Sequence, residues 1–458
     1  MGESAKTTGT AARDFRIAPG SAWAQAWKMA AAIGAIGVVG AGAGFAADAR
    51  RFAFSSLLGF AAVMTISLGS IFFILVQHLT GAGWSVTVRR TAEFLASGMI
   101  VVPLLLLPMA LAGTKHLYPW WGHTAGSAEH AQAMHEASAH AEGGDPEPGA
   151  AHAHEAHEAK AVAGHAEHTP EHAMHERTLE KKRAFLNSPF FYGRMVVYFA
   201  IWIFLALALF RQSVAQDTDG DPRWTIKRER FATWAMFLFA FSLTFAGFDW
   251  FMSLEPNWYS TMFGVRVFAS SVLISYAVII LITLGLRRAG VVGDEINVEH
   301  YHDLGKLMFG FLVFWAYVSF SEFMLIWYAS IPEETIYYHR RWDSSWWRTL
   351  SVSIVVLKFI VPFYLVISRN AKRNYGLIGL AAGWICVMHL VEMYYWVMPY
   401  YRDLGEMSLS FVGVTTDIAC IMAALGIYFA VVFRRMLNHP VIPIRDPRIG
   451  RALRFVNA

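Results

Sequence analysis

The sequence predicts an all-α polytopic membrane protein with about ten transmembrane helices. Hydrophobic residues make up 56% of the 458 residues and charged residues only 16%, and the mean hydropathy is +0.39. Because soluble domains carry about 25% charged residues, this composition places the chain in the membrane class. The aromatic content of 15% suits the belts of Trp and Tyr that membrane proteins carry at both bilayer surfaces.

Ten apolar runs are long enough to cross a hydrocarbon core of about 30 Å, which takes about 20 helical residues. The first run is the weakest because of its glycine content. The runs cover residues 28–46, 52–77, 93–113, 191–211, 231–254, 266–286, 304–330, 347–367, 376–398 and 409–433. An even number of spans places both termini on the same side of the membrane.

The distribution of basic residues predicts which side that is. They concentrate in the N-terminal segment, in the even-numbered loops and in the C-terminal tail, and include Arg89-Arg90, Lys227-Arg228, Arg287-Arg288, Lys372-Arg373 and Arg434-Arg435. Because cytoplasmic loops carry the excess of Lys and Arg, we expect both termini to be cytoplasmic. The chain then divides into a cytoplasmic segment (1–27), spans one to three (28–113), a periplasmic loop (114–190), spans four to ten (191–433) and a cytoplasmic tail (434–458).

The periplasmic loop is a low-complexity stretch of Ala, His, Glu and Gly with eleven histidines between His123 and His175. Spacings such as His152, His154 and His157 could bind a divalent metal. The favoured interpretation is an exposed disordered insertion, because little in this composition can fix a ligand geometry. We therefore assign no metal there.

The cysteine and histidine patterns argue against a cofactor held by this chain. Cys386 and Cys420 are the only cysteines and have no CxxC spacing, so the chain lacks a ligand set for an iron–sulfur cluster, structural zinc or covalent haem c. A transmembrane haem b needs two histidines at matched depth, and His78 and His389 lie at different depths. The absence of a phosphate-binding Gly-rich loop also argues against an ATP-driven pump.

Ionisable residues inside the predicted spans are the candidates for function. A carboxylate such as Glu322 near the middle of the bilayer costs several kcal/mol unless it faces a partner, the bundle interior or a water-filled cavity. Five such residues lie at similar depth in the outer half: Glu322, Lys358, His389, Glu392 and Asp417. Asp249, near the outer end of the fifth span, can be either a cap or the mouth of a path.

Together these groups form the inventory of a proton path or of a polar pocket for a redox-active head group. His389 and Glu392 are three residues apart, so they share a helix face and can form a hydrogen-bonded pair. Any single residue is equally well explained as part of a structural ion pair, for example Lys358 with Glu322.

Three segments carry a resemblance to a known family. They are GSIFFILVQHLTGAGWSVTVRR (69–90), FDWFMSLEPNWYSTMFG (248–264) and LGKLMFGFLVFWAYVSFSEFMLIWYASIPEET (304–335). They resemble the ActF family, the polysulfide-reductase-C-like (NrfD-like) integral membrane subunits of bacterial alternative complex III, a quinol:cytochrome c (or high-potential protein) oxidoreductase. The resemblance covers nearly the whole membrane part but not the His-rich loop.

The resemblance implies ten helices, most of them in two four-helix bundles, in the bacterial cytoplasmic (inner) membrane. It also implies a complex with a multihaem cytochrome c, an iron–sulfur protein, a monohaem cytochrome c and a sister NrfD-like membrane subunit. Haem c and iron–sulfur clusters are then expected in those partners, and a quinone is the one cofactor that could bind this chain. The sister subunit is usually credited with the quinol site.

Three functions follow as hypotheses. The first is a structural, non-catalytic subunit of a respiratory or photosynthetic electron-transport complex that contributes a proton path through Asp249, Glu322, Lys358, His389, Glu392 and Asp417. The second is a chain with its own quinol site, in which His389 or Glu392 accepts a proton as the ring is oxidised. A stand-alone transporter is the weaker third, because no pair of Gly- or Pro-broken helices recurs in two halves of the sequence.

Overall fold

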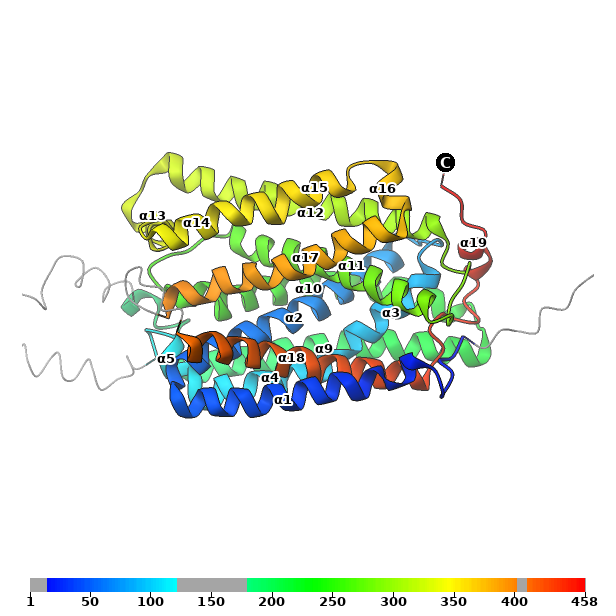
Figure 1. Cartoon of the computed structure of the whole chain (residues 1–458), viewed down its shortest axis with the longest axis horizontal. Coiled ribbons are helices and arrows are strands. Elements are labelled where there is room, and N and C mark those ends of the chain that lie inside the picture. The colour runs from blue at the N-terminus through cyan, green and yellow to red at the C-terminus, as the bar shows by residue number, and fades with distance from the viewer. Residues whose placement is uncertain (1–14, 122–178, 402–409, 458) are drawn as a thin grey trace, which may run out of the picture.

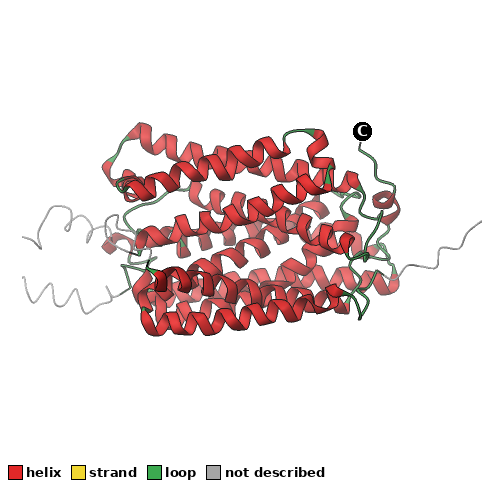
Figure 2. Ribbon diagram, viewed as in Figure 1, coloured by secondary structure: helices red, strands yellow, loops and turns green. Residues whose placement is uncertain are grey.

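The computed structural model describes residues 15–121, 179–401 and 410–457. These residues form an elongated bundle of helices that run roughly parallel to its long axis (Figures 1 and 2). Within the described ranges, ten helices are long and apolar enough to cross a membrane. The predicted fold class, an all-α multi-pass membrane protein, is therefore confirmed.

Eight spans consist mainly of one continuous helix each. These helices are α1 (Ala26–Ala47), α2 (Ala49–Leu79), α9 (Ser188–Asp219), α10 (Arg223–Trp250), α11 (Met262–Arg288), α12 (Val298–Ala329), α17 (Tyr375–Val397) and α18 (Phe411–Asn438). The third span combines α3 (Val86–Ser97), the 3₁₀ segment η2 (Gly98–Val101) and α4 (Val102–Pro108). The eighth combines α14 (Ser345–Ile354), the π-helical segment η5 (Val355–Ile360) and α15 (Val361–Val366).

Several helices extend beyond the predicted apolar runs. For example, α12 begins at Val298, six residues before the run at 304–330, where Asn297 caps it by accepting from the amides of Glu299 and His300. Hydropathy marks the part of a helix that suits hydrocarbon, whereas capping decides where the backbone hydrogen bonds begin.

The contacts divide the ten spans into two four-helix groups and a pair. One group holds α2, the α3–α4 span, α9 and α10, and the other holds α11, α12, the α14–α15 span and α17. The pair α1 and α18 packs along α2 (Figure 1). The two groups meet where α2 contacts α11, and both helices are largely buried inside the molecule.

Glycine explains how α1 joins the bundle. A Cβ on Gly37 would lie 2.2 Å from the backbone nitrogen of Ala423 on α18, and one on Gly426 would lie 2.3 Å from the nitrogen of Gly34. Helices in a membrane associate through such close backbone approach of small residues. The glycines that lower the hydropathy of this span therefore form the surface by which it packs against α18.

A second close approach joins the two groups. A Cβ on Gly69 of α2 would lie 1.9 Å from the carbonyl oxygen of Ser271 on α11. The same contact brings Ser70 and Ser275 within 2.8 Å, a hydrogen bond between hydroxyls. The seam between α2 and α11 thus holds a hydrogen-bonded pair of serines among mainly apolar side chains.

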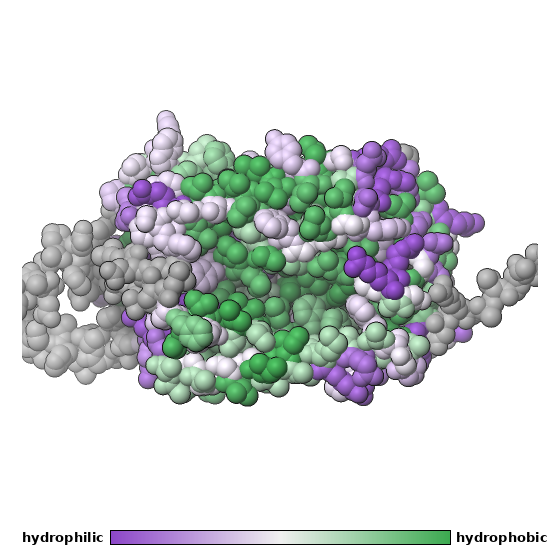
Figure 3. All heavy atoms as spheres, viewed as in Figure 1, coloured by the Kyte–Doolittle hydropathy of each residue, from purple (hydrophilic) through white to green (hydrophobic). Residues whose placement is uncertain are grey.

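The N-terminal segment and the C-terminal tail lie at the same end of the bundle, where the amide of Val441 donates to the carbonyl of Phe15 at 2.9 Å. We call this the α19 end, after α19 (Ile449–Leu453), and the opposite end the α13 end, after α13 (Pro332–Trp342) (Figure 1). Hydrophobic side chains cover the face between the two polar ends in Figure 3. Which end is cytoplasmic remains a prediction from the basic residues.

Candidate functional site

A buried ion pair lies in the second four-helix group. The Lys358 ammonium, carried by the π-helical segment η5, pairs with the Glu392 carboxylate on α17, and neither residue has any exposed surface. π-helical segments inside α-helices are frequent at functional sites. Two charges this deep are tolerated because each neutralises the other.

Two further helices complete the surroundings of Glu392. The hydroxyl of Ser270 on α11 donates to Glu392 Oε2, and the indole Nε1 of Trp315 on α12 donates to Oε1 at 2.6 Å. Lys358 Nζ also donates to Ser270 Oγ at 3.2 Å and lies 4.5 Å from the centre of the Trp315 ring. Both carboxylate oxygens therefore have donors, so the charge is held in one geometry.

His389 joins this cluster through hydroxyl groups. Its Nε2 lies 2.8 Å from Thr65 Oγ1 on α2, and its Nδ1 lies 3.4 Å from Ser270 Oγ. The predicted pair with Glu392 shares a helix face, and Nδ1 and Oε2 are 3.8 Å apart, which is an ion-pair contact but too long for a hydrogen bond. Ser270 instead contacts both side chains. We call Thr65, Ser270, Trp315, Lys358, His389 and Glu392 the central cluster.

Glu322 belongs to a neighbouring layer. It pairs with Arg266 at 3.1 Å and not with Lys358, the partner considered from the sequence. Arg266 precedes Ser270 by one turn on α11, and Glu322 follows Trp315 by two turns on α12, so the two layers share helix faces. The Arg266–Glu322 layer lies nearer the α13 end.

The polar groups continue beyond Glu322 into α13. Arg266 Nη1 lies 3.5 Å from Tyr337 Oη, and the buried Arg341 donates to the carbonyls of Tyr395 and Trp396. Burial raises the pKa of Tyr338, and the negative charge of Glu322 raises it further. Tyr338 therefore stays protonated beside that carboxylate.

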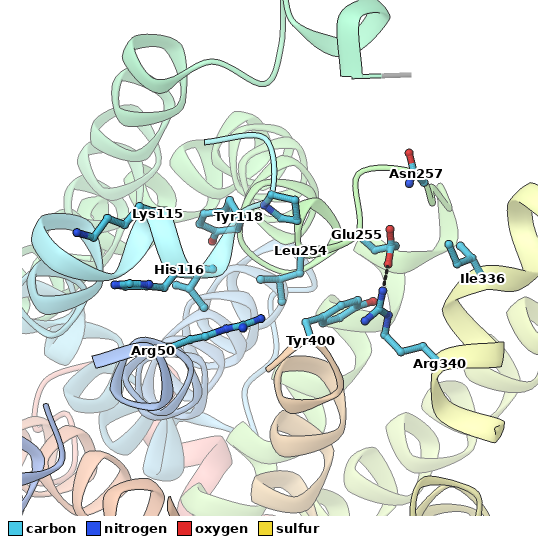
Figure 4. Close-up of a pocket in the computed structure, with 12 residues that line it drawn as sticks. Arg50, Lys115, His116, Tyr118, Leu254, Glu255, Asn257, Ile336, Arg340 and Tyr400 are labelled. Atoms are coloured by element: carbon cyan, nitrogen blue, oxygen red, sulfur yellow. Dashed lines mark ion pairs between the residues drawn. The ribbon is translucent and has the colours of Figure 1, made fainter. Parts of the chain in front are cut away.

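A polar pocket of about 550 Å³ opens at the α13 end beyond these residues. Arg340 and Glu255 form an ion pair of 3.2 Å in its wall, next to Tyr400 (Figure 4). Tyr400 also accepts from Arg341 at 3.3 Å. Arg341 thus connects the interior of the second group to the surface pocket.

The remaining two predicted residues lie elsewhere. Asp417 on α18 pairs with Arg51 and accepts from Ser55 at 2.5 Å, both on α2. Ser55 is ten residues from Thr65, about 15 Å along the helix. Asp249 belongs to the first group, where Arg194 binds it with two hydrogen bonds of 2.7 Å and Tyr198 donates a third.

The structure thus brings together Lys358, His389 and Glu392, places Glu322 in the adjacent layer, and does not join Asp249 or Asp417 to them. The partners that sequence reasoning missed are chiefly arginines. Arg51, Arg194 and Arg266 lie at or near the ends of apolar runs, and none of them was among the candidate residues. An arginine within three residues of a predicted span end, with a carboxylate at matching depth on another span, is the signal that could have found them.

An apolar pocket of about 580 Å³ reaches His389 from another side. Its walls come from α1, α2, α11, α17 and α18, and include Ile33, Ile66 and Leu425. Met29 and Ile33 at its rim are exposed on the outside of the bundle, where lipid tails would lie. The pocket therefore connects the apolar surface to the central cluster.

Among the described residues, no group of three or more His, Cys, Asp or Glu side chains is arranged to hold a metal ion. The histidines from His123 to His175 lie outside the described residues. Comparison with models of known protein families gives no match, and comparison with curated protein sequences gives none. The fold and the site define a multi-pass membrane protein with a buried ionisable cluster.

Proposed function

We propose that this chain is the integral membrane subunit of a bacterial quinol:cytochrome c (or high-potential protein) oxidoreductase complex, where it has a structural role and contributes a proton path. The central cluster is the observation that carries this proposal. It places an imidazole, a hydroxyl, a carboxylate and an ammonium from three membrane spans in consecutive contact. Intramembrane ionisable groups of this kind are typical of proton relays.

The charges of the cluster define how a proton would move. Lys358 and Glu392 sum to zero, so a proton that reaches His389 adds one buried positive charge. The Ser270 hydroxyl both donates and accepts, and it contacts His389, Glu392 and Lys358. Once Glu392 takes the proton, Lys358 loses its counter-charge and releases a proton more readily, which restores neutrality.

The exit route would run toward the α13 end, through the Arg266–Glu322 layer. Glu322 Oε1, Ser319 Oγ and Tyr338 Oη are buried there without a hydrogen-bond partner among the described protein groups. Buried polar atoms of this kind are usually satisfied by ordered water. Water molecules at these atoms would link Glu322 to α13 and to the surface pocket.

In this proposal the partners supply the redox centres. A multihaem cytochrome c, an iron–sulfur protein, a monohaem cytochrome c and the sister membrane subunit would carry electrons from quinol to the acceptor. We place the complex in the cytoplasmic membrane with the α13 end outside, as the basic residues predict. The chain itself would then move protons and would not transfer electrons.

Proton stoichiometry in vesicles tests the path. Glu392→Gln and His389→Ala in the reconstituted complex should keep quinol:cytochrome c electron transfer but at least halve the protons moved per electron. Lys306→Met is the matched control, because this lysine on α12 is half exposed and already paired with Asp303. An unchanged ratio in both cluster variants would exclude the path.

The apolar pocket favours a second candidate function, a quinol site in this chain. A quinol ring that entered from the lipid side would meet His389, which could accept its phenolic proton. A photoreactive quinone should then label residues around Ile66 and Leu425, and Ala62→Phe should block the labelling by filling the pocket. Labelling confined to the sister subunit would refute this site.

A further inference from the structure

Two adjoining pockets at the α13 end share the residues Lys115 and His116. The larger is the polar pocket described above, and Arg50 lines it beside these two residues. The smaller, of about 400 Å³, is also lined by Phe45, Leu111, Trp121 and Tyr192. Figure 4 shows Arg50, Lys115 and His116 together, apart from the Arg340–Glu255 pair.

The charge of these pockets is not balanced within the described part of the chain. Glu255 is the only carboxylate in either lining, and it pairs with Arg340. No described carboxylate lies within 4.0 Å of the Arg50 guanidinium or the Lys115 ammonium. Two positive charges therefore face one cavity with no counter-charge among the residues that the structure describes.

The position of these cations indicates the kind of anion. Lys115 and His116 follow the third membrane span directly, and Leu111, one turn earlier, is 82% exposed on the apolar surface. Phe45, near the end of α1, is 45% exposed beside the same pocket. The cations thus lie where a span leaves the hydrocarbon, at the level of lipid phosphates.

We propose that Arg50, Lys115 and His116 bind the phosphate of an anionic phospholipid whose acyl chains lie against Phe45 and Leu111. The shared pockets have the size of small-molecule sites, and an anionic headgroup supplies the negative charge that the lining lacks. Inorganic phosphate offers the same oxygen ligands without the acyl chains. The proposed path would end at the same polar pocket, but the lipid site does not rest on proton movement.

Native mass spectrometry of the delipidated full chain tests the proposal with phosphatidylglycerol and phosphatidylcholine. At about 1 kcal/mol per basic residue near a membrane surface, the variant Arg50→Ala/Lys115→Ala should lose about tenfold to thirtyfold in phosphatidylglycerol affinity. The control Arg223→Ala/Lys306→Ala removes the same charge from residues already paired with Asp221 and Asp303, and should change it less than twofold.

Two further arms distinguish the sources of phosphate and the effects of misfolding. Lys115→Arg should keep the preference for phosphatidylglycerol, and excess inorganic phosphate should not displace the lipid. Equal binding of both lipids, equal losses in the control, or full displacement by phosphate alone would each overturn the assignment. A loss of binding in Lys115→Arg would also overturn it, because that variant keeps the charge.

Discussion

At the scale of single residues, we expect the Lys358–Glu392 ion pair to add little net stability to the fold. Its importance lies in the charged groups that it places inside the membrane. Replacing a buried ion pair by apolar groups is often neutral, whereas removing one partner costs about 3–5 kcal/mol because the other charge stays buried. Ser270 and Trp315 still bind Glu392 when Lys358 is lost, so the carboxylate remains fixed in place.

A double-mutant cycle measures the energetic coupling between Lys358 and Glu392. Lys358→Met and Glu392→Gln should each lower the free energy of unfolding by about 3 kcal/mol, and the double variant should regain at least half of that loss. Thermal unfolding in one detergent, with Lys306→Met as control, gives the comparison. Additive losses in the double variant would show that the two side chains are not coupled.

The ion pairs of Asp446, a residue of the C-terminal tail, can be tested by measuring stability at different pH values. Its buried carboxylate lies 2.7 Å from Arg89 and 3.7 Å from Arg228. Burial alone would raise the pKa of Asp446, but the charges and hydrogen bonds of Arg89 and Arg448 hold the pKa well below its ordinary value of 3.8. The free energy of folding that ionised Asp446 contributes is therefore fully present above its unfolded-state pKa. It is lost as the pH falls from there through the lowered pKa of the folded state.

We expect Asp446→Asn to destabilise the chain by about 3 kcal/mol at neutral pH. The gap between the wild-type and variant melting temperatures should stay constant down to about pH 5 and narrow below pH 4. Asp294→Asn is the control, since that carboxylate is 98% exposed. A gap that widens on acidification would contradict the assignment of a lowered pKa.

At the scale of elements, the α1–α18 contact depends on glycine at particular positions. Gly37→Ala places a methyl group against the backbone of α18, whereas Gly42, on the same helix, has no atom within 4 Å of an added Cβ. We expect Gly37→Ala to lower the melting temperature by several degrees, at about 1–3 kcal/mol for overpacking, and Gly42→Ala to leave it unchanged. Equal effects would show that α1 does not pack in this register.

The elements also show what hydropathy can and cannot predict. The ten apolar runs predicted the spans, because composition and length decide what crosses a bilayer. Depth along each run placed Lys358 and Glu392 together correctly, but it also grouped Asp417 with them. Depth does not fix how a helix is rotated about its own axis. The sequence therefore could not show that Glu322 pairs with Arg266 and not with Lys358.

At the scale of the whole molecule, two four-helix groups meet along α2 and α11. The central cluster lies in the second group except for Thr65, which α2 of the first group contributes across that contact. Asp249 and Asp417 form pairs with Arg194 and Arg51 that are separate from the cluster. We therefore expect Asp249→Asn to reduce stability without changing proton movement. A selective loss of proton movement in that variant would extend the path into the first group.

The central claim, a membrane subunit of a redox complex, is tested most directly by purifying the tagged chain in a gentle detergent and recording a reduced-minus-oxidised spectrum of the product. The account predicts haem c absorption that co-purifies with the chain, together with quinol:cytochrome c activity. A colourless and inactive product, unchanged by milder extraction, would contradict it and make a stand-alone transporter the leading hypothesis.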